Sequence, residues 1–157
     1  MTSAQIEGVS KIYLGNSEIQ KVYLGTSLIY ELTSGLGPEI VLNGGFDDTS
    51  AWTNSAGLTI SGGVLNINAG NYASARQNVT LTAGKSYEVT YTVSGYVSGS
   101  IRPYFSGGTT VTGTVRSSNG TFNDTLVAAS GNNNIFISTI NIGFVGTIDN
   151  VSMKEVL

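Results

Sequence analysis

The chain has 157 residues, enough for one ordinary domain and a small additional module, and only 11% of them are charged, against about 25% in typical domains. A net charge of −3 with seven basic residues excludes the nucleic-acid-binding class, because neutralising a phosphate backbone takes clustered Lys and Arg. No apolar run reaches the roughly 18 residues that span a bilayer, and the first residues lack a basic start and an apolar core, so we predict neither a membrane segment nor a signal peptide.

The residue composition favours an all-β fold. Glycine (21 residues) and tyrosine (8) are abundant, proline is scarce (2), and apolar residues make up 40% of the chain. Short apolar runs separated by Gly, Ser, Thr and Asn are typical of strands joined by tight turns, and no segment keeps the period of a helix. The chain has no cysteine, so no disulfide framework is expected.

Residues 1–32 are predicted to form a small β module, because they contain a repeat at ten-residue spacing. Residues 10–17 read Ser-Lys-Ile-Tyr-Leu-Gly-Asn-Ser, and residues 20–27 read Gln-Lys-Val-Tyr-Leu-Gly-Thr-Ser. Each unit is a β-favouring triplet followed by a turn signal. We expect a ribbon of three short strands joined by two tight turns, at residues 11–14, 19–24 and 28–32.

Both faces of this module, called the arm below, are partly apolar. Strand alternation separates its aliphatic side chains from its tyrosines. The first face carries Ile12, Leu14, Val22 and Leu24, and the second carries Tyr13 and Tyr23. A ribbon of this size would leave its apolar surface wet. The arm packs either on its own chain or on another protein, and we expect the second.

The paired Lys-(Ile/Val)-Tyr-Leu-Gly-x-Ser units resemble the N-terminal segment of many virion proteins of tailed bacteriophages. The resemblance implies a protein that is assembled in the host cytoplasm and exposed on the particle surface. Its arm would bind the major capsid protein or another virion protein. One capsid contact would cover only one face of the arm, so we expect a homo-oligomer, a trimer, to cover the other.

A second domain is predicted over residues 39–157, after a linker of Thr, Ser, Gly and Pro at residues 33–38. It opens with the apolar run Ile-Val-Leu and a glycine-rich turn at residues 43–45. Two aromatic residues follow, Phe46 and Trp52. Large rings around a tight turn predict a strand that ends, turns and buries both rings in a core.

The middle of this domain reads as a series of short strands. We expect a hairpin over residues 57–68 and strands at residues 72–81, 86–93, 100–105, 109–115, 120–128, 134–142 and 148–156. Alternation is clearest in residues 86–93, where the inward face is Tyr87, Val89, Tyr91 and Val93. Pro103 should lie at an edge or a bulge, because proline cannot donate to a central ladder.

The two ends of the domain also resemble a known group. Asn-Gly-Gly-Phe with its Trp at the start, and Ile-Asp-Asn-Val-Ser at residues 148–152, resemble the first and last strands of carbohydrate-binding-module-like jelly rolls of the galactose-binding-like group. The resemblance spans roughly residues 39–156. It implies a jelly-roll β-sandwich, preceded in this chain by the arm.

The residue inventory argues against an enzyme. The chain has no His and no Cys, which removes Ser-His triads, thiol nucleophiles and most zinc sites. A glycosidase needs two cooperating carboxylates. Only Asp47 and Asp48 are close in sequence, and neighbouring residues on a strand point to opposite faces.

Two aspartates, one from each end of the domain, are candidates for a structural calcium site. Members of the resembled group often hold one calcium between the first and last strands, and by position its ligands here would be Asp47, Asp149 and carbonyls near Gly44 or Gly45. The sequence departs from the group by having Asp where many members have Glu after the Phe, which shortens the reach. The alternative is that both aspartates make Asx-turns.

Four residues on the polar faces of the predicted strands are candidates for binding a glycan. They are Tyr72, Arg76, Arg102 and Tyr104. Sugars stack on exposed aromatic rings flanked by polar side chains. The alternative is that these residues are ordinary cross-strand pairs on a sheet surface.

We therefore predict a non-enzymatic structural protein of the phage virion, of the capsid decoration or head-fibre type, with an outward-facing jelly roll. The alternative function is that of a glycan-binding tail adhesin, or of a carbohydrate-binding module that recognises glycans on the host surface. Calcium is the one cofactor considered, and neither nucleic acid nor membrane is an expected partner.

Overall fold

The computed structural model describes residues 13–14, 17–18, 21–24, 27–31, 35–69 and 72–157. The chain divides into two compact units, residues 1–35 with Leu157, and residues 36–156. In the described parts of the first unit, two hairpins form from β1 (Tyr13–Leu14) with β2 (Ser17–Glu18) and from β3 (Lys21–Leu24) with β4 (Ser27–Glu31).

The predicted three-stranded ribbon of the arm is therefore wrong, because the structure contains two separate two-stranded sheets. The additional strand, β2, is Ser17–Glu18, which follows a turn signal and has no apolar residue to mark it. Of the six residues proposed to bind a partner, Ile12 lies outside the described residues. The other five, Tyr13, Leu14, Val22, Tyr23 and Leu24, lie on β1 and β3, and their role stays a prediction.

The second unit is built from nine strands, and no helix occurs in its described residues. The strands are β5 (Leu36–Glu39), β6 (Thr53–Asn54), β7 (Leu58–Ser61), β8 (Val64–Asn68), β9 (Ser74–Asn78), β10 (Ser86–Ser106), β11 (Val111–Thr112), β12 (Gly120–Val127) and β13 (Asn134–Val156). Across the part of the chain that the structure describes, no helix is long and apolar enough to cross a membrane.

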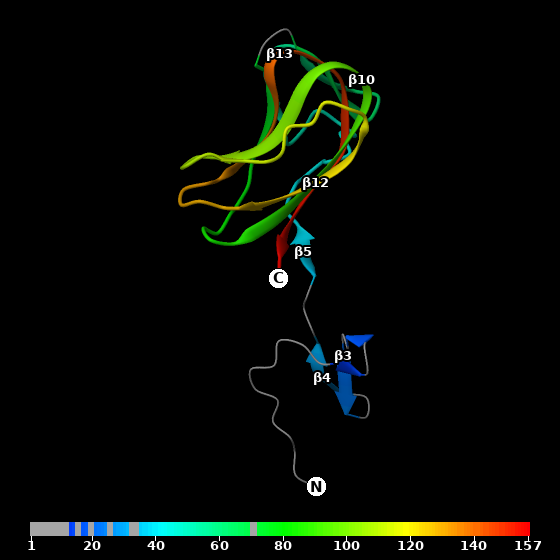
Figure 1. Cartoon of the computed structure of the whole chain (residues 1–157), viewed down its shortest axis with the longest axis vertical. Helices are drawn as coiled ribbons and strands as arrows, with labels where there is room; N and C mark the ends of the chain where they lie inside the picture. The colour runs from blue at the N-terminus through cyan, green and yellow to red at the C-terminus, as the bar shows by residue number, and fades with distance from the viewer. Residues whose placement is uncertain (1–12, 15–16, 19–20, 25–26, 32–34, 70–71) are drawn as a thin grey trace. The chain divides into compact units, whose positions relative to one another are not determined.

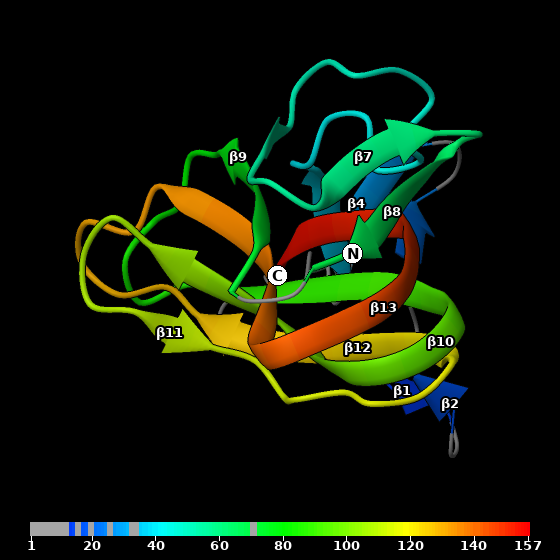
Figure 2. The same ribbon diagram turned by 90° about the horizontal axis from the view of Figure 1, so that it is seen from above.

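Two long strands, β10 and β13, run through the whole unit (Figure 1). The start of β10 and the end of β13 pair with each other, and with β12, β8 and β5, to form one sheet that β7 extends. The end of β10 and the start of β13 pair with each other, and with β11 and β9, to form a second sheet that β6 extends. Viewed from above, β10, β12 and β13 curve around a common interior (Figure 2). The predicted all-β sandwich is confirmed.

Glycines make the corners where these strands pass from one sheet to the other. Gly95 and Gly99 on β10 have φ of 57° and 81°, and Gly143 on β13 has φ of 84°. The β10–β13 register shifts on both sides of Ser98. Glycine accepts these left-handed angles and lets a continuous strand bend. Residues 86–93 and 100–105, predicted as separate strands, are therefore parts of one strand.

The core between the sheets follows the alternation predicted for residues 86–93, because Tyr87, Val89, Tyr91 and Val93 are all buried. The opposing inward faces contribute further aliphatic and aromatic side chains. The largest fully buried ones outside residues 86–93 are Phe46, Leu65, Ile101, Phe105, Ile135, Ile137, Phe144, Ile148 and Met153.

The glycine-rich turn that opens the domain buries both of its aromatic rings, as predicted. Phe46 is fully buried and its ring centroid lies 5.4 Å from that of Trp52, which is also buried. The indole Nε1 donates to the carbonyl of Asn43 at 3.0 Å. Asn43 also orders the turn, since its amide Nδ2 donates to the carbonyl of Asp48 at 2.9 Å. The two rings are thus fixed to the turn that precedes them.

A bulge in β13 receives this turn. The pairing of β13 with β10 shifts between Thr90 and Thr92, and Asn150 has φ of 52°. An extra residue of this kind, in the left-handed region, bends the strand. The bend lets the Val151 amide donate to the carbonyl of Gly44 at 2.9 Å. The Asp149-Asn150 pair, which interrupts the apolar pattern of the closing strand, therefore forms the bulge through which β13 contacts the turn at Gly44.

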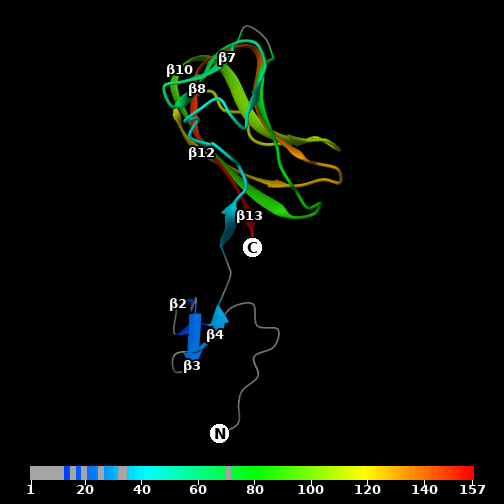
Figure 3. The ribbon, with the colours of Figure 1, turned by 180° about the vertical axis from the view of Figure 1, so that it is seen from behind.

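The predicted linker at residues 33–38 is wrong in its second half. From Leu36 the chain forms β5, which pairs with the end of β13 (Figure 3). The Glu39 carboxylate fixes this entry, since it accepts from the Met153 amide at 2.8 Å and from the Ser152 hydroxyl. Composition predicted a linker because Gly and Pro are uncommon in strands, yet Pro38 is tolerated where the ladder is short.

Pro103 lies at a bulge, as predicted. Its register partner on β13 is Ile137, and on its other side the ladder with β11 ends and resumes at the isolated bridge between Ile101 and Arg116. The proline carbonyl accepts from the Gly113 amide at 2.8 Å. A Cβ at position 113 would lie 2.7 Å from the proline ring, so glycine makes room for it.

The hydroxyl of Tyr91 is expected to make the domain sensitive to alkali. Tyr91 is fully buried, and its hydroxyl makes no hydrogen bond with the described residues. Burial, and secondly the charge of Asp124, raise the pKa of Tyr91 from 10.0 to about 12, which Arg116 partly opposes. The folded state thus keeps this proton where the unfolded state has lost it, so the stability is intact below about pH 10 and falls as the pH rises towards 12.

Tyr91→Phe should therefore reduce the fall of the free energy of unfolding between pH 10 and 12, as measured by urea denaturation at a series of pH values. At pH 7 the variant should be at least as stable as the native chain, because it buries no unpaired hydroxyl. Parallel pH profiles for the two proteins would contradict this account.

Candidate functional site

The outer face of the second sheet gathers aromatic and basic side chains. Alternation along β9, β10 and β13 turns every second residue away from the core. The register places Tyr104 opposite Phe136, and Phe136 opposite Arg76, in one row across three strands. The next row contains Arg102, Ser138 and Ser74. The five residues Arg76, Arg102, Tyr104, Phe136 and Ser138 are called the ring face below.

Two stacked rings lie at the centre of the ring face. The centroids of Tyr104 and Phe136 are 4.5 Å apart and their planes differ by 7°. Both side chains are only partly buried. Partial burial raises the pKa of the Tyr104 hydroxyl, and the charge of Arg102 partly opposes this. The phenol therefore stays protonated at neutral pH and can both donate and accept a hydrogen bond.

A hollow of about 420 Å³ lies beside Tyr104. Its lining combines tyrosine, arginine and hydroxyl side chains. The lining residues are Tyr72, Ala73, Ser74, Arg102, Tyr104, Ser106, Thr110, Ser138, Thr139 and Ile140. Tyr72 is 75% exposed at its mouth. The hollow offers aromatic surface together with several hydrogen-bonding groups.

A second hollow, of about 300 Å³, lies beside Phe136. Its lining residues are Thr53, Asn54, Ser55, Ser74, Arg76 and Phe136. Ser74 lines both hollows, so they adjoin. The ring face therefore presents a stacked pair of rings between two hollows, with one arginine in each.

The structure brings the sequence-predicted glycan residues to one surface. Tyr72, Arg102 and Tyr104 line the larger hollow, and Arg76 lines the smaller one. Sequence reasoning missed Phe136. The signal was available, since alternation through residues 134–140 puts Phe136 on the same face as Ser138, where a large ring among polar residues has no core to enter.

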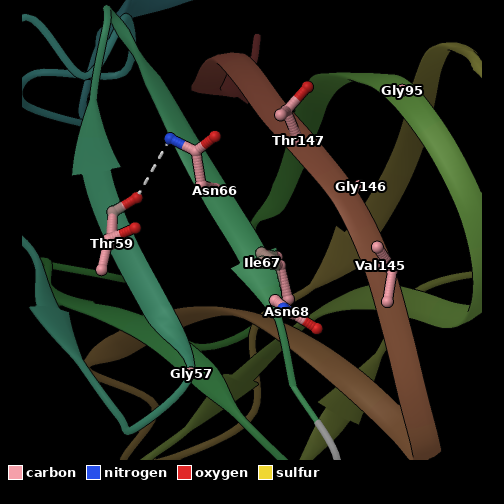
Figure 4. A pocket seen from close by; sticks show the side chains of 9 residues that line it. All are labelled: Gly57, Thr59, Asn66, Ile67, Asn68, Gly95, Val145, Gly146 and Thr147. Atoms are coloured by element: carbon pink, nitrogen blue, oxygen red, sulfur yellow. Dashed lines mark hydrogen bonds between the residues drawn. The ribbon is translucent and has the colours of Figure 1, made fainter.

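A hollow of about 510 Å³ lies on the outer face of the first sheet, over β7, β8 and β13 (Figure 4). Three of its lining residues are glycines, Gly57, Gly95 and Gly146, and none of the lining residues is aromatic or ionisable. Two of its polar side chains make hydrogen bonds within the protein, since the Thr147 hydroxyl donates to the carbonyl of Ser94 at 3.1 Å and Asn66 is also engaged. The Asn66 amide donates to the carbonyls of Ser61 at 3.1 Å and Thr59 at 3.5 Å. This surface therefore lacks the aromatic rings and arginines that the ring face presents.

Of the two candidate calcium ligands, Asp149 makes local hydrogen bonds with its carboxylate. Asp149 Oδ1 accepts from the backbone amide of the next residue, Asn150, at 2.6 Å, and Asp149 Oδ2 accepts from the Asn150 side-chain amide at 3.1 Å. The carbonyl of Gly44 accepts from Val151, and the Asp47 side chain is exposed. No group of three or more acidic, His or Cys side chains that could hold a metal occurs among the described residues.

These residues do not form a ready-made calcium site. Calcium takes six to eight oxygen ligands, and Asp149 Oδ1 and the Gly44 carbonyl already accept hydrogen bonds. A structural calcium stays a prediction, which melting in calcium and in EDTA would test.

Comparison with known proteins gives a consistent picture of the fold. No protein-family model matches the chain, and no curated protein matches it. A solved family 61 carbohydrate-binding module, in complex with β-1,4-galactotriose, matches with a TM-score of 0.53 and 20% identity, over 74% of this chain and 98% of that one.

Family 29 carbohydrate-binding modules match as well. One matches with a TM-score of 0.51 and 14% identity, over 74% of this chain and 86% of that one. A variant of such a module complexed with cellulohexaose matches with the same TM-score and identity and covers 89% of that chain. At these identities the likeness establishes that the domain has the β-sandwich fold of carbohydrate-binding modules.

Proposed function

We propose that this protein is a non-enzymatic carbohydrate-binding module whose ligand lies on the ring face. One observation carries the proposal, the stacked pair of Tyr104 and Phe136, which lies partly exposed between two adjoining hollows. Two large rings on the outside of a sheet cost solvation free energy unless a ligand covers them. The fold shared with carbohydrate-binding modules supports the same function.

The chemistry of the lining suits a saccharide. A pyranose ring has apolar C–H faces that pack on aromatic rings, and hydroxyls around its rim that need hydrogen-bond partners. The hollows supply the hydroxyls of Ser74 and Ser138, the Asn54 amide and the arginines. Because the two hollows adjoin, the face fits a chain of several sugar units better than a monosaccharide.

The proposal is tested by screening the whole chain on a glycan array and titrating the best ligand by calorimetry. Tyr104→Ala and Phe136→Ala should each weaken binding by roughly tenfold, because each loses a stacking contact of about 1 kcal/mol and exposes the other ring. Asn68→Ala, in the hollow of the first sheet, is the matched control and should bind like the native chain.

Two results would overturn the proposal. One is the absence of binding to every glycan on a broad array. The other is a ligand whose affinity falls with Asn68→Ala and is unchanged by both ring variants, which would move the site to the first sheet.

Placement on a phage particle remains a prediction, supported by the paired motif of residues 10–27. As a capsid decoration or head-fibre protein the chain would be anchored by its arm and trimeric; as a tail adhesin it would use the ring face on host glycans. A chain beginning at Gly35 retains β5 and should fail to join particles if the arm is the anchor. Normal incorporation of that shortened chain would rule the arm out.

A further inference from the structure

We infer that the ligand of the ring face is an anionic glycan, carrying carboxylate or sulfate groups at intervals along the chain. The inference rests on the proposed function and adds the charge of the ligand. Its basis is the distribution of charged residues over the domain. Residues 36–156 contain seven acidic and five basic side chains, yet the ring face carries two arginines, and no acidic residue lines either hollow.

The acidic side chains of the domain lie away from the ring face. Glu39 holds the first strand against the last, Glu155 pairs with Lys85 at 2.8 Å, and the buried Asp124 faces Arg116 at 3.5 Å. Four acidic residues remain. Asp47 and Asp48 lie in the turn after residue 46, and Glu88 and Asp149 lie on β10 and β13 in the first sheet. The ring face is therefore the positive surface of an acidic domain.

The two arginines of the ring face form no ion pair with any described residue, whereas Lys85 and Arg116 do. Arg76 is exposed and Arg102 is half-buried on the sheet. A guanidinium presents a planar fork of donors that matches a carboxylate or a sulfate in two parallel hydrogen bonds. Two such forks, neither of them in an ion pair within the described part of the chain, line the hollows beside the partly exposed rings and are complementary to a ligand with negative groups.

The positions of the arginines indicate a chain rather than a single anion. Arg102 lines the larger hollow and Arg76 the smaller one, with the ring pair between the hollows. Arg102 on β10 pairs with Ser138 on β13, which pairs with Ser74 on β9, so Arg102 and Ser74 are two strand spacings apart. Arg76 lies two residues after Ser74 on β9. Strand spacing and rise then put the two Cα atoms about 12 Å apart. Because the two guanidinium groups line different hollows, acidic groups on separate sugar units can each engage one of them.

Matched pairs of polymers test the inference on the whole chain. Polygalacturonate is compared with its fully methyl-esterified form, and dextran sulfate with dextran, by calorimetric titration at low and high salt. One charged member should bind at least about tenfold more tightly than its neutral match, with the preference shrinking as salt rises. Preference for the first pair identifies sugar carboxylates, and preference for the second identifies sulfates; either supports the inference.

Substitutions locate the effect. Arg76→Gln and Arg102→Gln should each weaken binding of the charged polymer by roughly tenfold, and Arg102→Lys should recover only part of the loss, because it keeps the charge without the fork. Lys154→Gln is the matched control, since it removes the same charge from β13 in the first sheet and should change binding by less than about twofold.

Three results would overturn the inference. Neutral polymers that bind as tightly as charged ones, with unchanged affinity in both glutamine variants, would leave the proposed function intact with a neutral ligand. Equal binding of a DNA oligonucleotide would reduce the preference to general attraction for polyanions. Loss of affinity in Lys154→Gln equal to that in Arg102→Gln would show that the net charge of the domain, and not the ring face, sets the preference.

Discussion

Gly44→Ala is expected to destabilise the domain strongly, lowering its free energy of unfolding by about 3 kcal/mol or more. A Cβ at this position would lie 1.8 Å from the carbonyl oxygen of Val151 and 2.9 Å from its carbonyl carbon. These are backbone atoms of the bulge in β13, so no side chain can turn aside. The turn would have to leave the bulge and lose the hydrogen bond between the Val151 amide and the Gly44 carbonyl.

Gly45→Ala is the matched control, one residue further along the same turn. Its Cβ would meet nothing closer than Asp47 Oδ2 at 3.7 Å, an ordinary contact. Urea denaturation should therefore separate the two alanine variants, with Gly45→Ala within about 1 kcal/mol of the native chain. Equal stability of both variants would show that the turn and the bulge do not depend on this close approach.

Gly99→Ala is the second substitution with a large expected effect, because two costs coincide. Gly99 has φ of 81°, which costs a residue with a side chain about 1 kcal/mol or more. Its Cβ would also lie 2.5 Å from both the Cα and the amide nitrogen of Phe144. Phe144 is fully buried, so moving its backbone disturbs the core. We expect a total loss of about 3 kcal/mol or more.

The other two corner glycines separate these costs. Gly95 and Gly143 have φ of 57° and 84°, but a Cβ at either position would meet nothing within 4 Å. Their alanine variants should lose only the conformational part, about 1 kcal/mol each. Thermal or urea denaturation of the three variants side by side makes the comparison. A loss at Gly95 or Gly143 as large as that at Gly99 would mean that the corner is limited by its angles alone.

The buried side chains of the core could be predicted from the sequence because their signals are local, whereas the pairing of the first and last strands could be expected only from the resemblance to jelly rolls. Alternation over residues 86–93 placed Tyr87 and Tyr91 inside, and the aromatic residues around a glycine-rich turn placed Phe46 and Trp52 there. Each inference needs only a strand's period of two and the cost of leaving large rings in water.

The continuity of the long strands could not be predicted in the same way. Gly95, Gly99 and the serines at positions 94, 98 and 100 are the same residue types as in a turn that ends a strand. Whether such a segment reverses the chain or bends it depends on the partner strand, here β13, which lies more than thirty residues later in the sequence. Local propensity holds no information about that partner.

The candidate site was also predictable only in part, because alternation is a local signal and strand register is not. Alternation put Arg102 and Tyr104 on a polar face, but the pairing of Tyr104 with Phe136 and of Phe136 with Arg76 is fixed by the register between β10, β13 and β9. A shift by one residue would send Phe136 into the core. Sequence could therefore name four of the residues and could not place them beside one another.

The pairing of β5 with the end of β13 has a consequence for protein engineering. Leu36 lies opposite Val156 on antiparallel neighbours, so the domain starts and finishes one strand spacing, about 5 Å, apart. A short loop could connect these positions, and the exposed hairpin at Gly62 and Gly63, where a Cβ meets no neighbour, could be opened to give a circular permutant with every ladder intact. For the same reason the domain could be inserted into a surface loop of an unrelated protein without spreading the ends of that loop.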